Sequence, residues 1–98
     1  MPKKKQKFKI IYLVTCKDRK GEWEFSCARF ADARKKAEAE RDEWLDEHGV
    51  TEENMQDYFN EDELFFRGTA KDGFYWHSVD HPDFPDFWIS VNQIRHYL

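Results

Sequence analysis

Residues 8–28 read FKIIYLVTCKDRKGEWEFSCA, and this stretch decides the fold. Its first nine residues are rich in β-branched and aromatic types, and the middle is apolar on both faces, as in a strand with neighbours on each side or a layer above and below. The turn residues KDRKG follow, with Gly21 where a positive φ is tolerated. In EWEFSCA, the residues Trp23, Phe25 and Cys27 alternate with polar ones, which predicts a half-buried strand paired with the first as a hairpin. The register stays open, because a slip of one residue would exchange the faces of the second strand.

After the hairpin the sequence changes to a helical pattern. Residues 32–48 read DARKKAEAERDEWLDEH, with Asp32 as a candidate N-cap and Gly49 as the C-terminal stop. The apolar stripe is narrow and consists of Ala33, Ala37, Trp44 and Leu45. Such a helix lies on one face of a sheet with its opposite side in water. Thr51 is a candidate cap for a second, short helix in TEENMQDYFN, whose inner face would be formed by Met55, Tyr58 and Phe59.

The C-terminal half predicts further strands, separated by a KDG turn and by the loop HPDFPDF: 64–67, 74–79 and 88–91. The element order is therefore ββα(α)βββ. We expect an α+β fold in which a small antiparallel sheet carries one long and one short helix packed on one face. Residues 1–7 are expected to form a flexible basic N-terminal tail, and residues 8–98 a single α+β domain.

Length and composition limit the class of protein. A chain of 98 residues has room for one domain with one core. With 40% hydrophobic residues it is too apolar to be disordered, and no apolar run approaches the roughly 18 residues of a membrane span. Aromatic residues, at 17%, must supply much of the buried area. Because no signal peptide is evident and the only cysteines are Cys16 and Cys27, we expect a cytoplasmic protein with reduced, structural thiols.

Charge is distributed unevenly along the chain. Residues 1–20 carry eight Lys/Arg and one Asp, whereas residues 38–63 carry twelve Asp/Glu and one Arg. The basic run is either a solvated tail or an arm that contacts nucleic acid independently of base sequence, through Lys3, Lys4, Lys5 and Lys7.

The acidic segment is either a solvated helix face or a surface for a basic partner. Carboxylates one helical turn apart are separated by about 5–6 Å, the same order as the spacing along a phosphate backbone. Such a segment could occupy the nucleic-acid groove of an enzyme. In composition it is similar, in a general way, to small phage-encoded inhibitors that imitate DNA, and no motif assigns the chain to a family.

Residues 81–88, HPDFPDFW, combine turn composition with three large aromatic rings. The prolines reduce the entropy lost when the loop becomes ordered. The rings either close the open end of the core or anchor a partner, because aromatic side chains carry much of the binding energy at interfaces. Trp88 is expected to close the core, since it begins a strand, and Phe84 is the better candidate for exposure.

The sequence contains no trustworthy catalytic or metal motif. His77 and His81 lie among aspartates, but a strand followed by a Pro-bearing loop would make their rings diverge. The serines lack a nucleophile elbow, the glycines are scattered singly, and neither cysteine has an evident base. We therefore expect no enzymatic activity, no metal and no cofactor.

These observations favour a non-enzymatic module that binds a protein partner with a basic surface. The sharpest version is a phage or mobile-element inhibitor of a nucleic-acid-handling enzyme. Charge would raise the association rate, and the rings would slow dissociation. The predicted partner-binding residues are Glu40, Glu43, Glu47, Glu52, Glu53, Asp57, Glu61, Phe84 and Phe87. The alternative is a small nucleic-acid-binding protein that uses the basic N-terminal arm, with the oligomeric state open in both cases.

Overall fold

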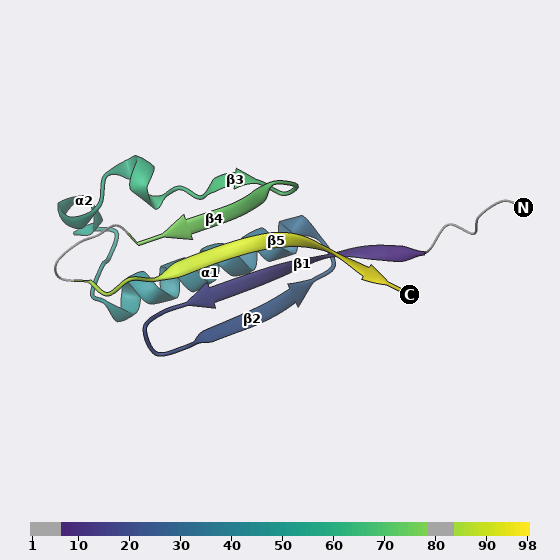
Figure 1. The fold of residues 1–98 in the computed structure, drawn as a ribbon. Coiled ribbons are helices and arrows are strands. Elements are labelled where there is room, and N and C mark those ends of the chain that lie inside the picture. Colours follow the sequence, from purple (N-terminus) through teal and green to yellow (C-terminus); the bar gives the residue numbers. More distant parts are fainter. Residues whose placement is uncertain (1–6, 79–83) are drawn as a thin grey trace, which may run out of the picture.

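The N-terminal hairpin forms one side of an antiparallel sheet. The computed structural model describes residues 7–78 and 84–98, and within them the sheet has five strands in the order β2-β1-β5-β4-β3 (Figure 1). The elements are β1 (Phe8–Lys17), β2 (Glu22–Cys27), α1 (Phe30–Glu47), α2 (Met55–Tyr58), the 3-10 helix η1 (Glu61–Leu64), β3 (Arg67–Thr69), β4 (Gly73–His77) and β5 (Trp88–Tyr97). This is the α+β fold with the predicted element order.

Strand β1 has a neighbour on each side, which explains why its middle is apolar on both faces. Val14 pairs with Phe25 of β2 and with Val91 of β5. This register turns Phe25 toward the core, together with Trp23 and Cys27. The turn before β2 differs from the expectation, because Gly21 has no positive φ. Instead, the Asp18 carboxylate shapes the turn by accepting hydrogen bonds from the backbone N–H groups of Lys20 and Gly21, at 2.8 and 2.9 Å.

Helix α1 packs across one face of the sheet, against β1, β2 and β5. Its buried side chains are the predicted stripe: Ala33, Ala37, Trp44 and Leu45. The helix begins at Phe30 rather than after Asp32, because the Phe30 ring packs edge-on against Tyr12 and Phe74, at centroid distances of 5.7 and 5.3 Å. It ends as predicted at Gly49, which has a φ of 74°. Hydrogen bonds from Gly49 N–H to the Asp46 carbonyl and from Val50 N–H to the Leu45 carbonyl complete a Schellman cap.

The segment after α1 is less regular than predicted. Helix α2 is one turn long, and of its expected inner face Phe59 is buried, Met55 is partly buried and Tyr58 is exposed. The strand expected at 64–67 is replaced by η1 followed by β3. A capping box between Asn60 and Glu63 starts the 3-10 turn, so the extended backbone begins only after Leu64.

Strand β5 is much longer than the predicted 88–91. It pairs with β1 over ten residues, from Lys17 opposite Trp88 to Phe8 opposite Tyr97. The polar sequence NQIRHY lacks a strong strand signal, and it is extended because β1 offers a full-length edge with which to pair.

Candidate functional site

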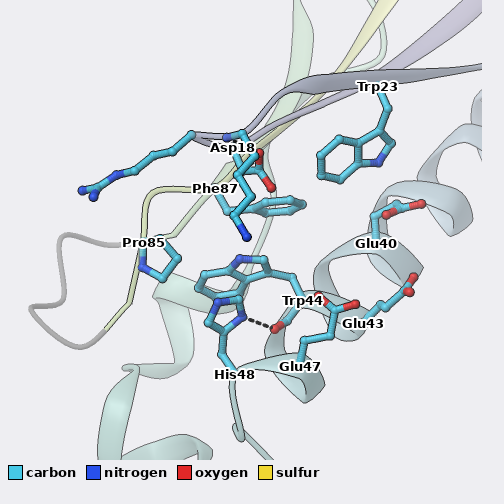
Figure 2. Close-up of a pocket in the computed structure, with 11 residues that line it drawn as sticks. Asp18, Trp23, Glu40, Glu43, Trp44, Glu47, His48, Pro85 and Phe87 are labelled. Atoms are coloured by element: carbon cyan, nitrogen blue, oxygen red, sulfur yellow. Dashed lines mark hydrogen bonds between the residues drawn. The ribbon is translucent and has the colours of Figure 1, made fainter.

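A cleft of about 540 Å³ opens between the C-terminal half of α1 and the β1–β2 turn (Figure 2). The turn contributes Asp18, Arg19 and Lys20, β2 contributes Trp23, and the loop before β5 contributes Pro85 and Phe87. The helix and its cap contribute Glu40, Glu43, Trp44, Glu47 and His48. The cleft therefore combines segments that are far apart in the sequence.

Stacked aromatic side chains form the floor of the cleft. Trp44 and Phe87 are buried and stack with a centroid distance of 5.5 Å and an interplanar angle of 19°. Trp23 lies 5.8 Å from Phe87 and faces the helix from β2 (Figure 2). Phe87 is held in place by its backbone, because Phe87 N–H donates to Ser78 Oγ and Ser78 N–H donates to the Phe87 carbonyl, both at 2.9 Å. This floor is fixed before any ligand arrives.

Three glutamates form one wall of the cleft. Glu40, Glu43 and Glu47 are spaced i, i+3 and i+7, so they lie in a row along one side of α1 (Figure 2). Glu40 is largely covered and pairs with Lys36 at 3.5 Å. Glu43 and Glu47 are exposed, and neither forms an ion pair with any residue in the described part of the chain. The wall thus presents free negative charge above an aromatic floor.

The end of α1 intensifies this negative charge. Its last turn contains no basic residue, although Asp46 and Glu47 lie there. The C-terminus of a helix carries a partial negative charge of its own. His48 Nδ1 lies 2.8 Å from the Trp44 carbonyl oxygen, which accepts a hydrogen bond, and the His48 ring packs 4.4 Å from the Trp44 ring.

The thiol beneath this wall is chemically quiet. Burial raises the pKa of the Cys16 thiol to about 12 from an ordinary value of 9.0; the charge of Glu40 adds to the shift and Lys36 opposes it. A thiol that stays protonated at neutral pH is a poor nucleophile. Cys16 and Cys27 are both free cysteines.

The remaining predicted acidic residues lie outside the cleft. Glu52, Glu53, Asp57 and Glu61 are exposed on the segment that follows α1. Within the described residues, the ion pairs of the acidic segment 38–63 involve only Glu38, Glu40 and Asp42, with Arg34, Lys36 and Arg41. The structure therefore leaves most of these carboxylates without an ion pair in the described part of the chain, and of the predicted acidic residues only Glu40, Glu43 and Glu47 line this cleft.

The aromatic loop is arranged differently from the prediction. Phe87 is 2% exposed, so its ring lies in the core and does not project from the loop. Phe84 is partly buried, stacked on Phe59 at 5.7 Å and edge-on to Tyr58 at 5.2 Å. Trp88, expected inside, is 48% exposed. The reason is strand alternation: Phe87 precedes β5 on its helix-covered side, and Trp88 therefore points to the uncovered face.

Several other predicted residues fall at or beyond the limits of the described structure. Lys3, Lys4, Lys5 and His81 lie outside it. Lys7 is exposed, and its carbonyl accepts a hydrogen bond of 3.0 Å from the Leu98 N–H. His77 stacks on Trp88 with a centroid distance of 3.5 Å, and its Nε2 lies 3.8 Å from Asp86 Oδ1. Among residues 7–78 and 84–98 no group of three or more His, Cys, Asp or Glu side chains is placed to hold a metal ion.

Seven residues that line the cleft were not predicted as site residues: Asp18, Arg19, Lys20, Trp23, Trp44, His48 and Pro85. Alternation in β2 placed Trp23 on the inner face, but only the hairpin register sets it opposite the glutamates.

No protein-family model, curated protein or solved structure matches the chain. In the described ranges no helix is long and apolar enough to cross a membrane.

Proposed function

We propose that this protein is a non-enzymatic binding module that docks onto a basic surface of a partner protein through its acidic end. The acidic end consists of the C-terminal half of α1 and the segment that follows it up to Glu61. The observation that carries the proposal is the pair Glu43 and Glu47, exposed and unpaired within the described chain, beside the aromatic floor of the cleft. Unneutralised carboxylates attract a basic surface at long range and speed its association.

The cleft itself suits the side chain of an arginine or lysine. Such a side chain has an apolar stem, which can contact Trp23 and Trp44, and a cationic end, which can pair with Glu43. Arginine is the better fit, because its planar guanidinium can stack on a ring and bind a carboxylate through two hydrogen bonds. The opposite rim, formed by the β1–β2 turn, carries Arg19 and Lys20. Their positive charges repel a bound cation from that side of the cleft.

In its sharpest form the partner is a nucleic-acid-handling enzyme, and the protein is an inhibitor encoded by a phage or other mobile element. Along the chain, the acidic row on α1 is followed by Glu52, Glu53, Asp57 and Glu61, which are exposed and add negative charge after the helix. Carboxylates spaced by one helical turn approximate the spacing of phosphates, so such a surface can occupy a groove that binds nucleic acid.

The proposal is tested with a synthetic arginine-rich peptide, whose binding is followed by the fluorescence of Trp23 and Trp44. We expect E43Q/E47Q to weaken binding by about tenfold, since each exposed pair contributes up to about 1 kcal/mol. The matched control is E22Q/E24Q, which removes two exposed carboxylates from β2. If both double variants lose affinity equally, the effect is one of net charge and the cleft is not the site.

Removing the cations on the opposite rim of the cleft should have the opposite effect on peptide affinity. R19Q/K20Q removes two cations that line the same cleft, so it should strengthen peptide binding severalfold. Weaker binding by R19Q/K20Q would mean that the cleft selects an anion, which contradicts the proposal.

A further inference from the structure

The sheet continues beyond its helix as a two-stranded ribbon. Residues 8–11 of β1 pair with residues 94–97 of β5, whereas β2 pairs with β1 only from Tyr12 onward and β4 pairs with β5 only up to Val91. Figure 1 shows this ribbon projecting at the end of the molecule opposite α2, with the C-terminus beside it. The ribbon is therefore remote from the acidic end.

The ribbon has the opposite charge to the acidic end. Lys7, Lys9, Arg95 and His96 are exposed there, and β1 and β5 contain no aspartate or glutamate. Within residues 7–78 and 84–98 none of these side chains forms an ion pair. The positive charge of Lys7, Lys9 and Arg95 is thus available to an anionic ligand.

One side of the ribbon is hollowed into a groove of about 310 Å³. Strands β1 and β5 contribute Phe8, Ile10, Gln93 and Arg95, and the β3–β4 turn contributes Ala70 and Lys71. No carboxylate is among these lining residues. The groove combines apolar surface with cations, which is the combination that binds a strand of phosphates and bases.

Aromatic rings stand exposed at the end of the ribbon. Phe8 is 42% and Tyr97 50% exposed, and their centroids lie 5.8 Å apart. The Arg95 guanidinium lies 5.0 Å from the Phe8 centroid. Exposed rings beside guanidinium and ammonium groups can stack on unpaired bases while the cations contact the phosphates.

We propose that the ribbon, residues 7–11 and 94–98 with Lys71, is a second binding surface whose ligand is single-stranded nucleic acid. Arg95 and Lys71, which line the groove, would contact the phosphate backbone, and Phe8 and Tyr97 would stack on bases on the same face. A single strand fits better than a duplex, because the bases of a duplex are already stacked on one another and offer no free faces to these rings. The acidic end repels the same ligand, so binding is confined to the ribbon.

The test measures fluorescence anisotropy of a labelled oligothymidine of about 15 nucleotides with the full chain at several salt concentrations. We expect K71Q/R95Q to bind at least about tenfold more weakly and to have a salt slope shallower by about 1.4, because each lost phosphate contact removes about 0.7 from the slope. The matched control K17Q/K35Q removes two exposed cations outside the groove and the cleft, and it should change affinity less than about threefold. Equal losses in both double variants would overturn the proposal. Circular dichroism confirms that each variant is folded.

Further variants and ligands in the same assay distinguish binding at the ribbon from binding elsewhere in the chain. Phe8→Leu should weaken binding by about tenfold with no change in salt slope, because it removes a stacking surface and no charge. Binding that is lost in K3Q/K4Q/K5Q and unaffected in K71Q/R95Q would place the site in the N-terminal segment and overturn the ribbon assignment. Equal or tighter binding of a duplex of the same length would overturn the single-strand assignment. E43Q/E47Q should not weaken oligonucleotide binding, because it removes only charges that repel the strand, and a loss of affinity in this variant would contradict the ribbon assignment.

Discussion

Phe84→Ala tests whether the aromatic loop belongs to the core. In the structure Phe84 packs against Phe59, Tyr58 and Trp44, with centroid distances of 5.7, 5.2 and 5.9 Å. Truncation of a fully buried phenylalanine costs about 3–5 kcal/mol, so a partly buried one should cost about 2 kcal/mol. The lost ring pairs add about 0.5–1 kcal/mol. We therefore expect the free energy of unfolding to fall by about 2–3 kcal/mol.

The assay is urea unfolding followed by tryptophan fluorescence, with the slope m compared between variants. At about 1.5 kcal/mol per M urea, the midpoint should fall by about 1.3–2 M with unchanged m. The control is Phe65→Ala, because Phe65 also lies in an irregular segment but is 59% exposed, and its loss should cost less than about 1 kcal/mol. Equal costs for the two variants would show that Phe84 is not packed as described, and the loop would again be a candidate anchor for a partner.

Three further predictions concern the core and the sheet. The free energy of unfolding should fall by about 1.4 kcal/mol per pH unit between pH 9.0 and about pH 12, because the pKa of the Cys16 thiol is raised only in the folded chain. Urea unfolding of Cys16→Ala over this range should lack this decline. Parallel pH profiles of the two proteins would contradict the prediction. Gly68→Ala should disrupt the β3–β4 pairing and accelerate amide hydrogen exchange in β4, because Gly68 has a φ of 91° and a Cβ there would lie 1.8 Å from the Gly73 carbonyl oxygen. Trp76→Phe should cost about 1–2 kcal/mol in thermal unfolding, because it removes the 2.9 Å hydrogen bond from Trp76 Nε1–H to the Glu63 carbonyl; no change would show that this bond contributes nothing.

The parts of the fold that could be predicted from sequence are those with local signals. Alternation in β2, the stripe on α1 and the stop at Gly49 were each visible in neighbouring residues and are confirmed. The length of β5 was not visible, because Asn92 and Gln93 are extended by pairing with β1 and not by their own propensity. The 3-10 turn η1 was missed because its capping box depends on two side chains in a polar segment.

The candidate site was predictable in charge but not in shape. An acidic helix face follows directly from the spacing of Glu40, Glu43 and Glu47. Which aromatic residues stand beside it depends on register and loop closure, which sequence alone left open. Phe87 was expected at a partner interface and is core, whereas Trp88 was expected in the core and is exposed. Phe87 and Trp88 are adjacent at the start of β5, and successive side chains in a strand point to opposite faces. A shift of one residue in the alternation therefore decides which of the two is buried and which is exposed.

Under the proposed function, the last turn of helix α1 sets folding stability against the binding of a basic partner. Holding Asp46 and Glu47 in its last turn, with no base nearby in the helix, costs about 0.3–1 kcal/mol per charge in the unliganded protein. A cation seated beside Glu47 relieves that electrostatic frustration, so part of its apparent affinity is the recovery of a penalty incurred during folding. We therefore expect Glu47→Lys to raise the melting temperature and to weaken the binding of a basic partner. Selection for thermal stability alone would not retain Glu47.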